Sequence, residues 1–294
     1  MSVHQPSPRT APVPRRRRVP LVAAPLTVAL AAGVLLPATA TSAPAEQVRT
    51  TSTVAPQPGP AAGGGTRPGY HYAAAAAYTP SGTWATGFGA TFTVHNPRQV
   101  KARRGQHSIG QLAVSDTTIG LPYLEAGWRK GAGLRSQKRP RLFVFWRPVN
   151  SGDTCYNFGC GFVRKGKGKK PGAKLRPGSK VKLEFVHRGS KWWFKVNGKK
   201  SGYYPDRLWR GRFTRANFAQ VFGEIYVHGS DRLCADMGNG RRPGAKKRSA
   251  RISKVHWTGG PSMALTRGAV TDPRVYGLTV TSATAMRFGG PGRC

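Results

Sequence analysis

Acidic residues are scarce in this sequence. Ten Asp and Glu stand against 48 Lys and Arg, which gives a formal net charge of +38 at pH 7. Such a surface is attracted to polyanions, including anionic cell-wall polymers, nucleic acid and membrane surfaces. The alternative is a basic surface that serves only solubility. Two basic segments, residues 163–180 and 239–251, contain no aromatic residue, so specific nucleic-acid binding has no support from them.

Several catalytic patterns are also missing. The seven histidines show no His-x-x-x-His or similar frame, so the sequence predicts neither a metal site nor another cofactor. No serine lies in a nucleophile-elbow motif, which disfavours a serine hydrolase. The ten carboxylates remain as candidate catalytic groups.

A long apolar run occurs at one place, near the N-terminus. Four arginines at 15–18 precede an apolar stretch at 19–36, and the small residues Ala-Thr-Ala follow at 38–40. This order predicts an export signal over residues 1–40 and a secreted, extracellular protein. A retained membrane anchor is the alternative, and two prolines inside the stretch disfavour it. Cleavage would leave 43 basic and 10 acidic residues, a net charge of +33.

No amphipathic helix of three turns is evident in the rest of the chain. Residues 41–68 are rich in Pro, Gly, Ala and Thr, which predicts a linker or a short pro-segment. Residues 69–294 form the expected domain. Its short β-branched and aromatic runs, among 38 glycines and 24 prolines, predict an all-β domain built as an antiparallel β-sandwich. We expect strands at 89–96, 107–114, 141–149, 180–188, 191–198, 219–229, 250–257 and 276–283, with a hairpin turn at 187–191.

Four cysteines occur, and all follow the predicted signal. An even number in an exported chain predicts two disulfides, for which three connectivities exist. We favour the pairing of Cys155 with Cys160 in a small loop and of Cys234 with Cys294 at the C-terminus. Spacing alone does not distinguish this pairing from the other two.

Two of the ten acidic residues are placed where an ionised carboxylate is costly. Most of the others lie in loop-like or linker sequence, and Glu184 is expected on the solvent-facing side of its strand. Glu224 lies within the apolar run AQVFGEIYVHG, and Glu125 lies in GLPYLEAGW. Period-two alternation puts Glu224 on one face with Phe222, Tyr226 and His228.

Glu125 shares its strand face with Tyr123 and Gly127 by the same alternation. A glycine next to each glutamate would let a substrate chain approach closely. Two such carboxylates on neighbouring strands would share one proton, so that one acts as general base and the other as general acid. The alternative is that one or both glutamates pair with arginines.

Motifs from Tyr70 to the C-terminus resemble, in order, those of the neprosin family of secreted glutamic peptidases. They are LEAGW (124–128), RLFVFW (141–146), TCYNFGCGFV (154–163), KWWFKVNGKKSGYYPDRLW (191–209), VFGEIYV (221–227), DMGNGRRP (236–243) and FGGPGRC (288–294). The resemblance covers nearly the whole chain after the linker. It departs from the family at Phe222, where the family has a glycine.

The resemblance implies a β-sandwich peptidase in which Glu125 and Glu224 are the catalytic pair. It also implies a Cys155–Cys160 disulfide, cleavage after proline in peptide or protein substrates, and a polar contribution to the cleft from Gln111. Four aromatic residues are candidate substrate-binding walls, with core packing as the alternative for each: Tyr123, Trp128, Tyr203 and Tyr204.

Two other functions fit parts of the sequence. A glycoside hydrolase or sugar-binding sandwich would also use paired carboxylates on an aromatic face. A non-catalytic cationic β-sandwich would bind cell-wall polyanions or glycans and use its glutamates structurally.

Overall fold

A computed structural model describes residues 69–98, 100–101, 105–131, 137–147, 155–157, 161–228, 232–244 and 248–293. The predicted signal at 1–40 and linker at 41–68 lie outside these residues, as do Cys160, Cys294 and the side chain of Cys155. In the described part, no helix has the length and apolar character needed to cross a membrane.

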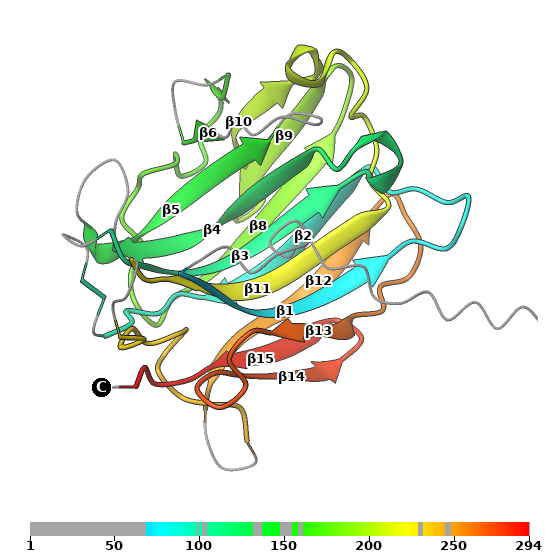
Figure 1. The fold of residues 1–294 in the computed structure, drawn as a ribbon. Helices are drawn as coiled ribbons and strands as arrows, with labels where there is room; N and C mark the ends of the chain where they lie inside the picture. Colours follow the sequence, from blue (N-terminus) through cyan, green and yellow to red (C-terminus); the bar gives the residue numbers. More distant parts are fainter. Residues whose placement is uncertain are drawn as a thin grey trace, which may run out of the picture. The chain divides into compact units, whose positions relative to one another are not determined.

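Two antiparallel sheets make up the described chain (Figure 1). The seven-stranded sheet has, in spatial order, β13 (Thr266–Val270), β1 (Tyr70–Tyr78), β11 (Phe218–Tyr226), β3 (His107–Ser115), β4 (Tyr123–Gly131), β5 (Gln137–Arg147) and β6 (Cys155–Tyr156). The eight-stranded sheet has β14 (Gly277–Ser282), β15 (Ala285–Gly289), β12 (Ala250–Thr258), β2 (Gly87–Thr93), β8 (Lys180–His187), β9 (Lys191–Val196), β10 (Lys199–Pro205) and β7 (Val163–Arg164). The prediction of an all-β antiparallel sandwich is confirmed.

The alternation of the sequence explains the strands of the eight-stranded sheet. In β9, Trp192, Phe194 and Val196 are buried, whereas the residues between them are partly exposed. β8 and β9 form the expected hairpin, and the turn lies between His187 and Lys191. Period-two alternation of this kind is typical of strands with one face in the core and one toward water.

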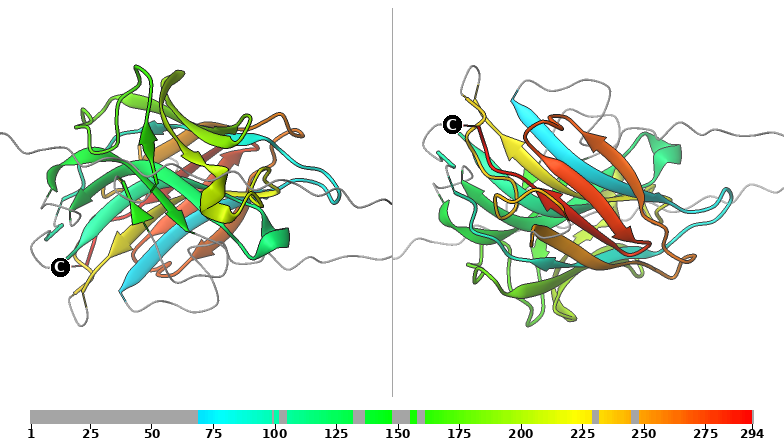
Figure 2. Two further views of the ribbon diagram at one scale, coloured as in Figure 1. Left: turned by 90° about the horizontal axis from the view of Figure 1, so that it is seen from above. Right: turned by 90° about the horizontal axis from the view of Figure 1, so that it is seen from below.

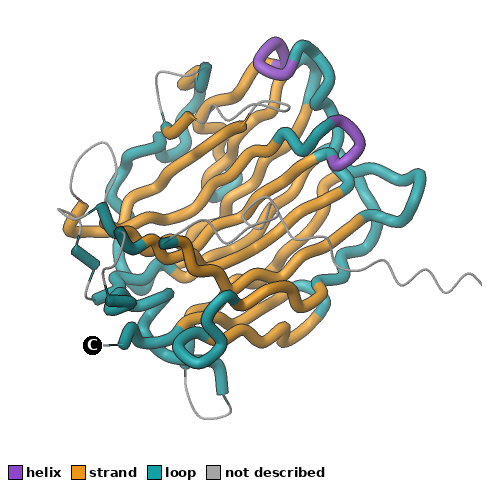
Figure 3. Tube along the Cα trace, viewed as in Figure 1, coloured by secondary structure: helices purple, strands orange, loops and turns teal. Residues whose placement is uncertain are grey.

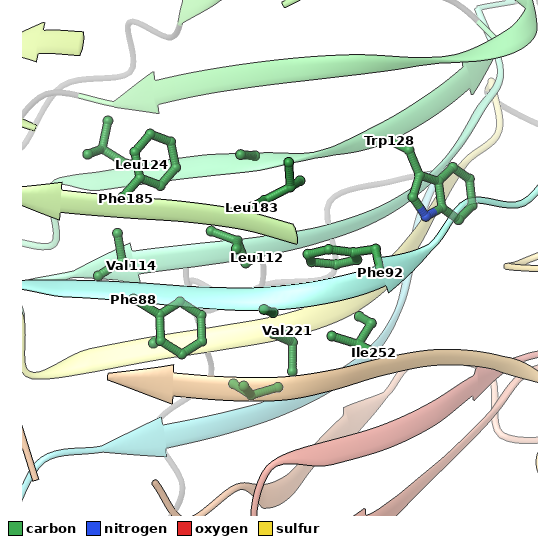
Figure 4. Packing of buried hydrophobic residues seen from close by; sticks show 14 of the residues in the cluster. Phe88, Phe92, Leu112, Val114, Leu124, Trp128, Leu183, Phe185, Val221 and Ile252 are labelled. Carbon is green, nitrogen blue, oxygen red and sulfur yellow. The ribbon is translucent and has the colours of Figure 1, made fainter. Parts of the chain in front are cut away.

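The core lies between the two sheets, which the views of Figure 2 show as stacked layers. Side chains from both sheets meet there, among them Leu112 and Leu124 from the seven-stranded sheet and Phe88 and Leu183 from the eight-stranded one (Figure 4). All four are fully buried. Only two short 3₁₀ turns, η3 (Thr117–Ile119) and η4 (Asp206–Trp209), interrupt the strands and loops of the described chain (Figure 3).

β1 was not predicted as a strand. Its sequence, YHYAAAAAY, holds five consecutive alanines, which favour helix in isolation. The strand forms because it pairs with β11 over its full length and with β13 on its other side. Tertiary pairing therefore overrides local propensity here. The predicted ranges also omitted β10, β13 and β15, and β4 was inferred only through the alternation around Glu125.

The last described residue, Arg293, lies close to Cys234. The backbone N–H of Arg293 donates to the carbonyl of Leu233 over 2.6 Å, which brings the neighbours of Cys234 and Cys294 together. Cys234 is disulfide-bonded. Its pairing with Cys294, like that of Cys155 with Cys160, lies outside the described residues and stays a prediction.

Candidate active site

The outer face of the seven-stranded sheet carries both candidate glutamates. Strand register places Glu224 of β11 opposite Ile109 of β3, and Glu125 of β4 opposite Ala113 of β3. Residues that pair across an antiparallel ladder point to the same face, so both carboxylates share the face of Gln111. The expectation that the two glutamates lie on neighbouring strands is wrong, because β3 lies between β11 and β4.

Glu224 is held by two side chains from β3. His107 Nε2 lies 2.7 Å from Glu224 Oε1, and Gln111 Nε2 donates to Glu224 Oε2 over 3.2 Å. All three side chains are buried, and Glu224 is 8% exposed. An ionised carboxylate only accepts hydrogen bonds, so a hydrogen-bond partner at each of its two oxygens suits the buried anion.

Glu125 has a different environment. Burial raises the pKa of Glu125 well above its ordinary value, and the nearby Glu224 carboxylate raises it further, while Arg147 acts in the opposite direction. The residue as a whole is nevertheless partly exposed. The two glutamates therefore differ in their stable forms, with Glu125 favouring the neutral acid and Glu224 placed to accept hydrogen bonds.

Tyr72 is a site residue that the sequence analysis missed. It pairs with Glu224 across β1 and β11, and it is buried. The pKa of its phenol is raised, first by burial and then by the charges of Glu224 and Glu125. The alternation of Tyr70 and Tyr72 before the alanine run could have indicated a strand with both rings on one face. It was not used, because the alanine run was not predicted to be part of a strand.

Aromatic rings border the two carboxylates. On the Glu125 side, Tyr123 stacks on Phe145 with ring centroids 6.1 Å apart. On the Glu224 side, Tyr72 meets Phe222 edge to face at 6.3 Å. Tyr72 and Phe222 form a small apolar cluster with Ala74 and Ala113. The predicted placement of Tyr123 at the carboxylate face therefore agrees with the structure.

The other three aromatic candidates lie elsewhere, which corrects the prediction for them. Trp128 is fully buried on the opposite face of β4, where it packs into the core between the sheets. Tyr204 is fully buried in the same core, and Tyr203 packs on Trp193 in the other sheet. Trp128 and Tyr204 follow the alternative of core packing because their alternation directs them inward.

The glycines next to the glutamates make room for protein atoms. A Cβ on Gly223 would lie 2.3 Å from the Phe288 ring, on the core side of β11. A Cβ on Gly127 would lie 2.2 Å from the Gly110 carbonyl oxygen and 2.7 Å from Gln111 Cβ. Gly223 faces the core, which corrects the expectation that it admits a substrate chain. Gly127 shares the face of Gln111, and the expectation for it stays a prediction.

Glu184 also departs from its prediction. Instead of facing solvent, it is 8% exposed and accepts a hydrogen bond from Thr258 Oγ1 at 2.9 Å. His256 Nε2 lies 3.4 Å from Glu184 Oε1, and Lys195 Nζ lies 3.5 Å from Oε2. This cluster lies on the eight-stranded sheet and is separate from the two candidate glutamates.

No group of three or more His, Cys, Asp or Glu side chains that could hold a metal ion occurs among the described residues. The chemistry available at the carboxylate face is therefore that of Glu125, Glu224, Gln111, His107 and Tyr72. One carboxyl that favours its neutral form and one that accepts hydrogen bonds as an anion are suited to general acid–base catalysis.

Comparisons with known proteins identify one family. A family model described as Neprosin matches residues 104–291, which includes Glu125 and Glu224. No curated protein matches the sequence.

Two solved structures illustrate the likenesses in fold. A scytalido-glutamic peptidase with a transition-state analogue inhibitor has 10% identity and a TM-score of 0.44, covering 75% of this chain and 98% of its own. A homodimeric agglutinin from chicken liver has 14% identity and a TM-score of 0.30, covering 54% of this chain and 96% of its own. Nothing about the activity of this chain follows from these two likenesses.

Proposed function

The chain belongs to the Neprosin family, and we propose that it is a secreted acid endopeptidase of the glutamic type that uses Glu125 and Glu224. The family match supports a peptidase function. The observation that carries the catalytic assignment is the difference between the two carboxyl groups on one sheet face. The pKa of Glu125 is raised well above its ordinary value, and Glu224 has a hydrogen-bond partner on each oxygen.

From this difference we infer the two catalytic roles. Glu224, as the anion, is the general base that takes a proton from a bound water molecule, and that water attacks the scissile carbonyl carbon. Glu125, as the neutral acid, donates a hydrogen bond to the developing oxyanion and then protonates the leaving amine. After the C–N bond breaks, Glu224 releases to solvent the proton that it took from water, and Glu125 takes up one proton from solvent, so both groups return to their starting forms. Each positioned proton transfer contributes about 10²–10⁴-fold to the rate.

The same difference favours catalysis at acid pH. Glu125 must hold its proton to act as the acid, and its raised pKa keeps that proton over a wider pH range than an ordinary glutamate would. Activity therefore falls as the pH rises through the pKa of Glu125. An activity optimum at pH 8 or above contradicts the mechanism.

A preference for cleavage after proline belongs to this proposal as well. The rings of Tyr72 and Phe222 on one side, and of Tyr123 and Phe145 on the other, border the carboxylates. Flat apolar rings of this kind suit the compact pyrrolidine ring of proline. Phe222 is fully buried and fills space on the Glu224 side, so we expect it to narrow the range of accepted residues.

The test incubates the exported protein with proline-containing peptides from pH 3 to 8. Mass spectrometry then measures hydrolysis of the peptides. We expect cleavage at acid pH, and we expect Glu125→Gln and Glu224→Gln each to lower kcat by about 10²-fold or more. Glu184→Gln is the matched control, because Glu184 is an equally buried glutamate on the other sheet. Circular dichroism would verify that all variants fold. Cleavage that survives either active-site substitution contradicts the catalytic pair.

A further inference from the structure

His107 lies between the Glu224 carboxylate and a guanidinium group. Its Nε2 is 2.7 Å from Glu224 Oε1, and its Nδ1 is 3.1 Å from a terminal nitrogen of Arg129. These contacts join three strands, because His107 is on β3, Glu224 on β11 and Arg129 on β4. His107 is 5% exposed. The sequence analysis did not single out this histidine.

The Arg129 contact determines where the imidazole carries its proton. A guanidinium nitrogen can only donate hydrogen bonds, so Nδ1 of His107 must accept. The proton of the neutral ring is then on Nε2, which donates to Glu224 Oε1. A protonated imidazole would instead place a second N–H against the Arg129 donor and a second positive charge beside it.

The surroundings of His107 favour the same neutral form. Burial lowers the pKa of His107, and the Arg129 charge lowers it further, although the hydrogen bond to Glu224 acts in the opposite direction. The other groups packed on the ring are aromatic: Tyr226 stacks on it at 5.5 Å, and Tyr70 meets it edge to face at 6.1 Å. Among the described residues, Glu224 and Arg129 are the charged groups that contact this ring.

We propose that His107 and Arg129 form a positioning pair that holds Glu224 as an oriented anion at acid pH, with Arg129 keeping His107 in its neutral, Nε2-protonated form. This inference rests on the proposed function. With Oε1 held by His107 and Oε2 by Gln111, the carboxylate is fixed on both oxygens. Its remaining lone pairs are then available to a water molecule in a defined direction.

Variants of His107 test the positioning role by kinetics. We expect His107→Leu to lower kcat/KM about 10–100-fold and to move the acid limb of the pH profile upward by about one pH unit, because the anion loses a donor. His107→Gln, whose side-chain amide can donate in place of Nε2, should recover at least part of the loss. Equal losses in both variants, with an unchanged acid limb, would overturn the proposal.

Nitrogen NMR of the histidine ring tests the tautomer independently of activity. We expect the wild-type ring to carry its proton on Nε2 when neutral and to become protonated only below the ordinary histidine pKa of about 6.5. Arg129→Gln should make the ring protonate at higher pH, because it removes the adjacent cation. A wild-type ring that protonates at or above that ordinary value, or a titration unchanged by Arg129→Gln, contradicts the inference. Absence of any peptide cleavage by the folded wild type would reject the proposed function instead.

A second and independent site is carried by the outer face of the eight-stranded sheet. Strand register and alternation place five lysines of β8, β9 and β10 on this face. We call the surface that they form the basic face, and its residues are Lys180, Lys182, Lys191, Lys195 and Lys200. The exposed basic residues of segment 164–170 run beside it. That segment is fixed to β10 by backbone hydrogen bonds from Lys165 to Ser201 and from Gly168 to Lys200.

Two aromatic rings hold part of this charge in place. Lys200 Nζ lies 4.1 Å from the centre of the Trp193 ring, and Lys191 Nζ lies 5.2 Å from the centre of the Tyr203 ring. The two rings contact each other at 4.9 Å. Because an ammonium group covers a face of each ring, the rings are less available to stack on nucleic-acid bases. They act as supports for fixed positive charge.

We propose that the basic face binds a linear phosphate-bearing polymer through its repeating charges. Ammonium groups bind phosphate as point charges, and a row of them on a flat sheet can follow an extended chain. Glu184 is the acidic residue on β8, and Lys195 lies 3.5 Å from its carboxylate, which reduces its repulsion of the polymer. The face belongs to the sheet opposite the catalytic one, so binding there leaves the carboxylate face open.

The probe is long-chain inorganic polyphosphate, titrated at several salt concentrations. We expect the combined change of Lys180, Lys182, Lys191 and Lys200 to Gln to weaken binding more than 10-fold and to reduce the slope of log K against log salt by about 3. The control removes equal charge from exposed positions outside β7 to β10, with Arg98, Arg241, Arg267 and Arg274 changed to Gln. Equal weakening in both variants overturns the site, as does tighter binding of single-stranded polyuridine than of polyphosphate at equal charge.

Discussion

The side-chain amide of Gln111 links the central strand of the candidate site to Glu224. Its Nε2 donates to Glu224 Oε2 over 3.2 Å, while its Oε1 is buried and has no hydrogen-bond partner among the described residues. Gln111 also lies between the strand of Glu224 and the strand of Glu125. An amide in this position can hold the anion with one end and meet water or substrate with the other.

Substitution of Gln111 should therefore impair catalysis more than folding. We expect Gln111→Leu to lower kcat/KM about 10–100-fold, because Glu224 loses one of its two partners. Ser249→Ala is the control, since Ser249 is a buried polar residue that precedes β12 of the other sheet, and its Oγ also has no hydrogen-bond partner among the described residues. The comparison requires kinetics at the pH optimum together with urea denaturation. Equal kinetic losses in the two variants would indicate a general packing effect.

The basic limb of the pH profile should depend on Arg147. Its positive charge opposes the rise in the pKa of Glu125, so Arg147→Gln should raise that pKa further. Because Glu125 acts in its protonated form, activity in the variant should persist to higher pH. The measurement is kcat/KM from pH 3 to 8, with Arg251→Gln on the other sheet as the control. A basic limb that stays in place or moves to lower pH contradicts the assignment of Glu125 as the acid.

The Glu184 cluster should contribute to stability in a defined pH window. The hydrogen bond from His256, followed by those of Thr258 and Lys195, lowers the pKa of Glu184 to about 2, and the hydrogen bond to Glu184 raises the pKa of His256. The Glu184 contribution is present above its ordinary pKa of about 4.3 and is lost as the pH falls toward 2. The His256 contribution is present below about 6.5 and is lost as the pH rises through its raised value.

Glu184→Gln should accordingly lower the free energy of unfolding by about 1–3 kcal/mol near pH 5.5. The loss should shrink at pH 2 and again at alkaline pH, where the wild type has lost one of the two charges. Urea denaturation at the three pH values measures this. Thr91→Val, on the same face of the neighbouring strand β2, is a control for loss of a polar group. A loss that is independent of pH would show that the pair contributes packing alone.

Gly223 should tolerate no side chain. A Cβ there would lie 2.3 Å from the Phe288 ring, so Gly223→Ala should destabilise the fold by about 1–3 kcal/mol through overpacking. Phe288→Leu frees space at the same contact, and the two changes should cost less together than the sum of their separate effects. Thermal unfolding of the four proteins in the cycle gives the coupling. Additive losses would show that the ring does not limit this position.

Much of the architecture was readable from the sequence because it depends on local alternation. Phe185 and Phe194 follow the two-residue period of their strands and are both fully buried, and the hairpin that joins them has the predicted turn. The same alternation put Glu224 with Tyr226, and Glu125 with Tyr123, on their respective strand faces. A period of two determines which way a side chain points without knowledge of the partner strand.

The partners of each strand were decided by the tertiary structure. His107, Tyr72 and Glu224 lie on three strands that are far apart in the sequence, and only sheet order brings them together. Glu184 shows the same dependence on sheet order. Alternation identified its strand face, but the His256 side chain that contacts it comes from 72 residues away in the sequence. Alternation specifies direction along one strand, whereas burial, pairing and the pKa of a carboxyl depend on contacts that long-range pairing creates.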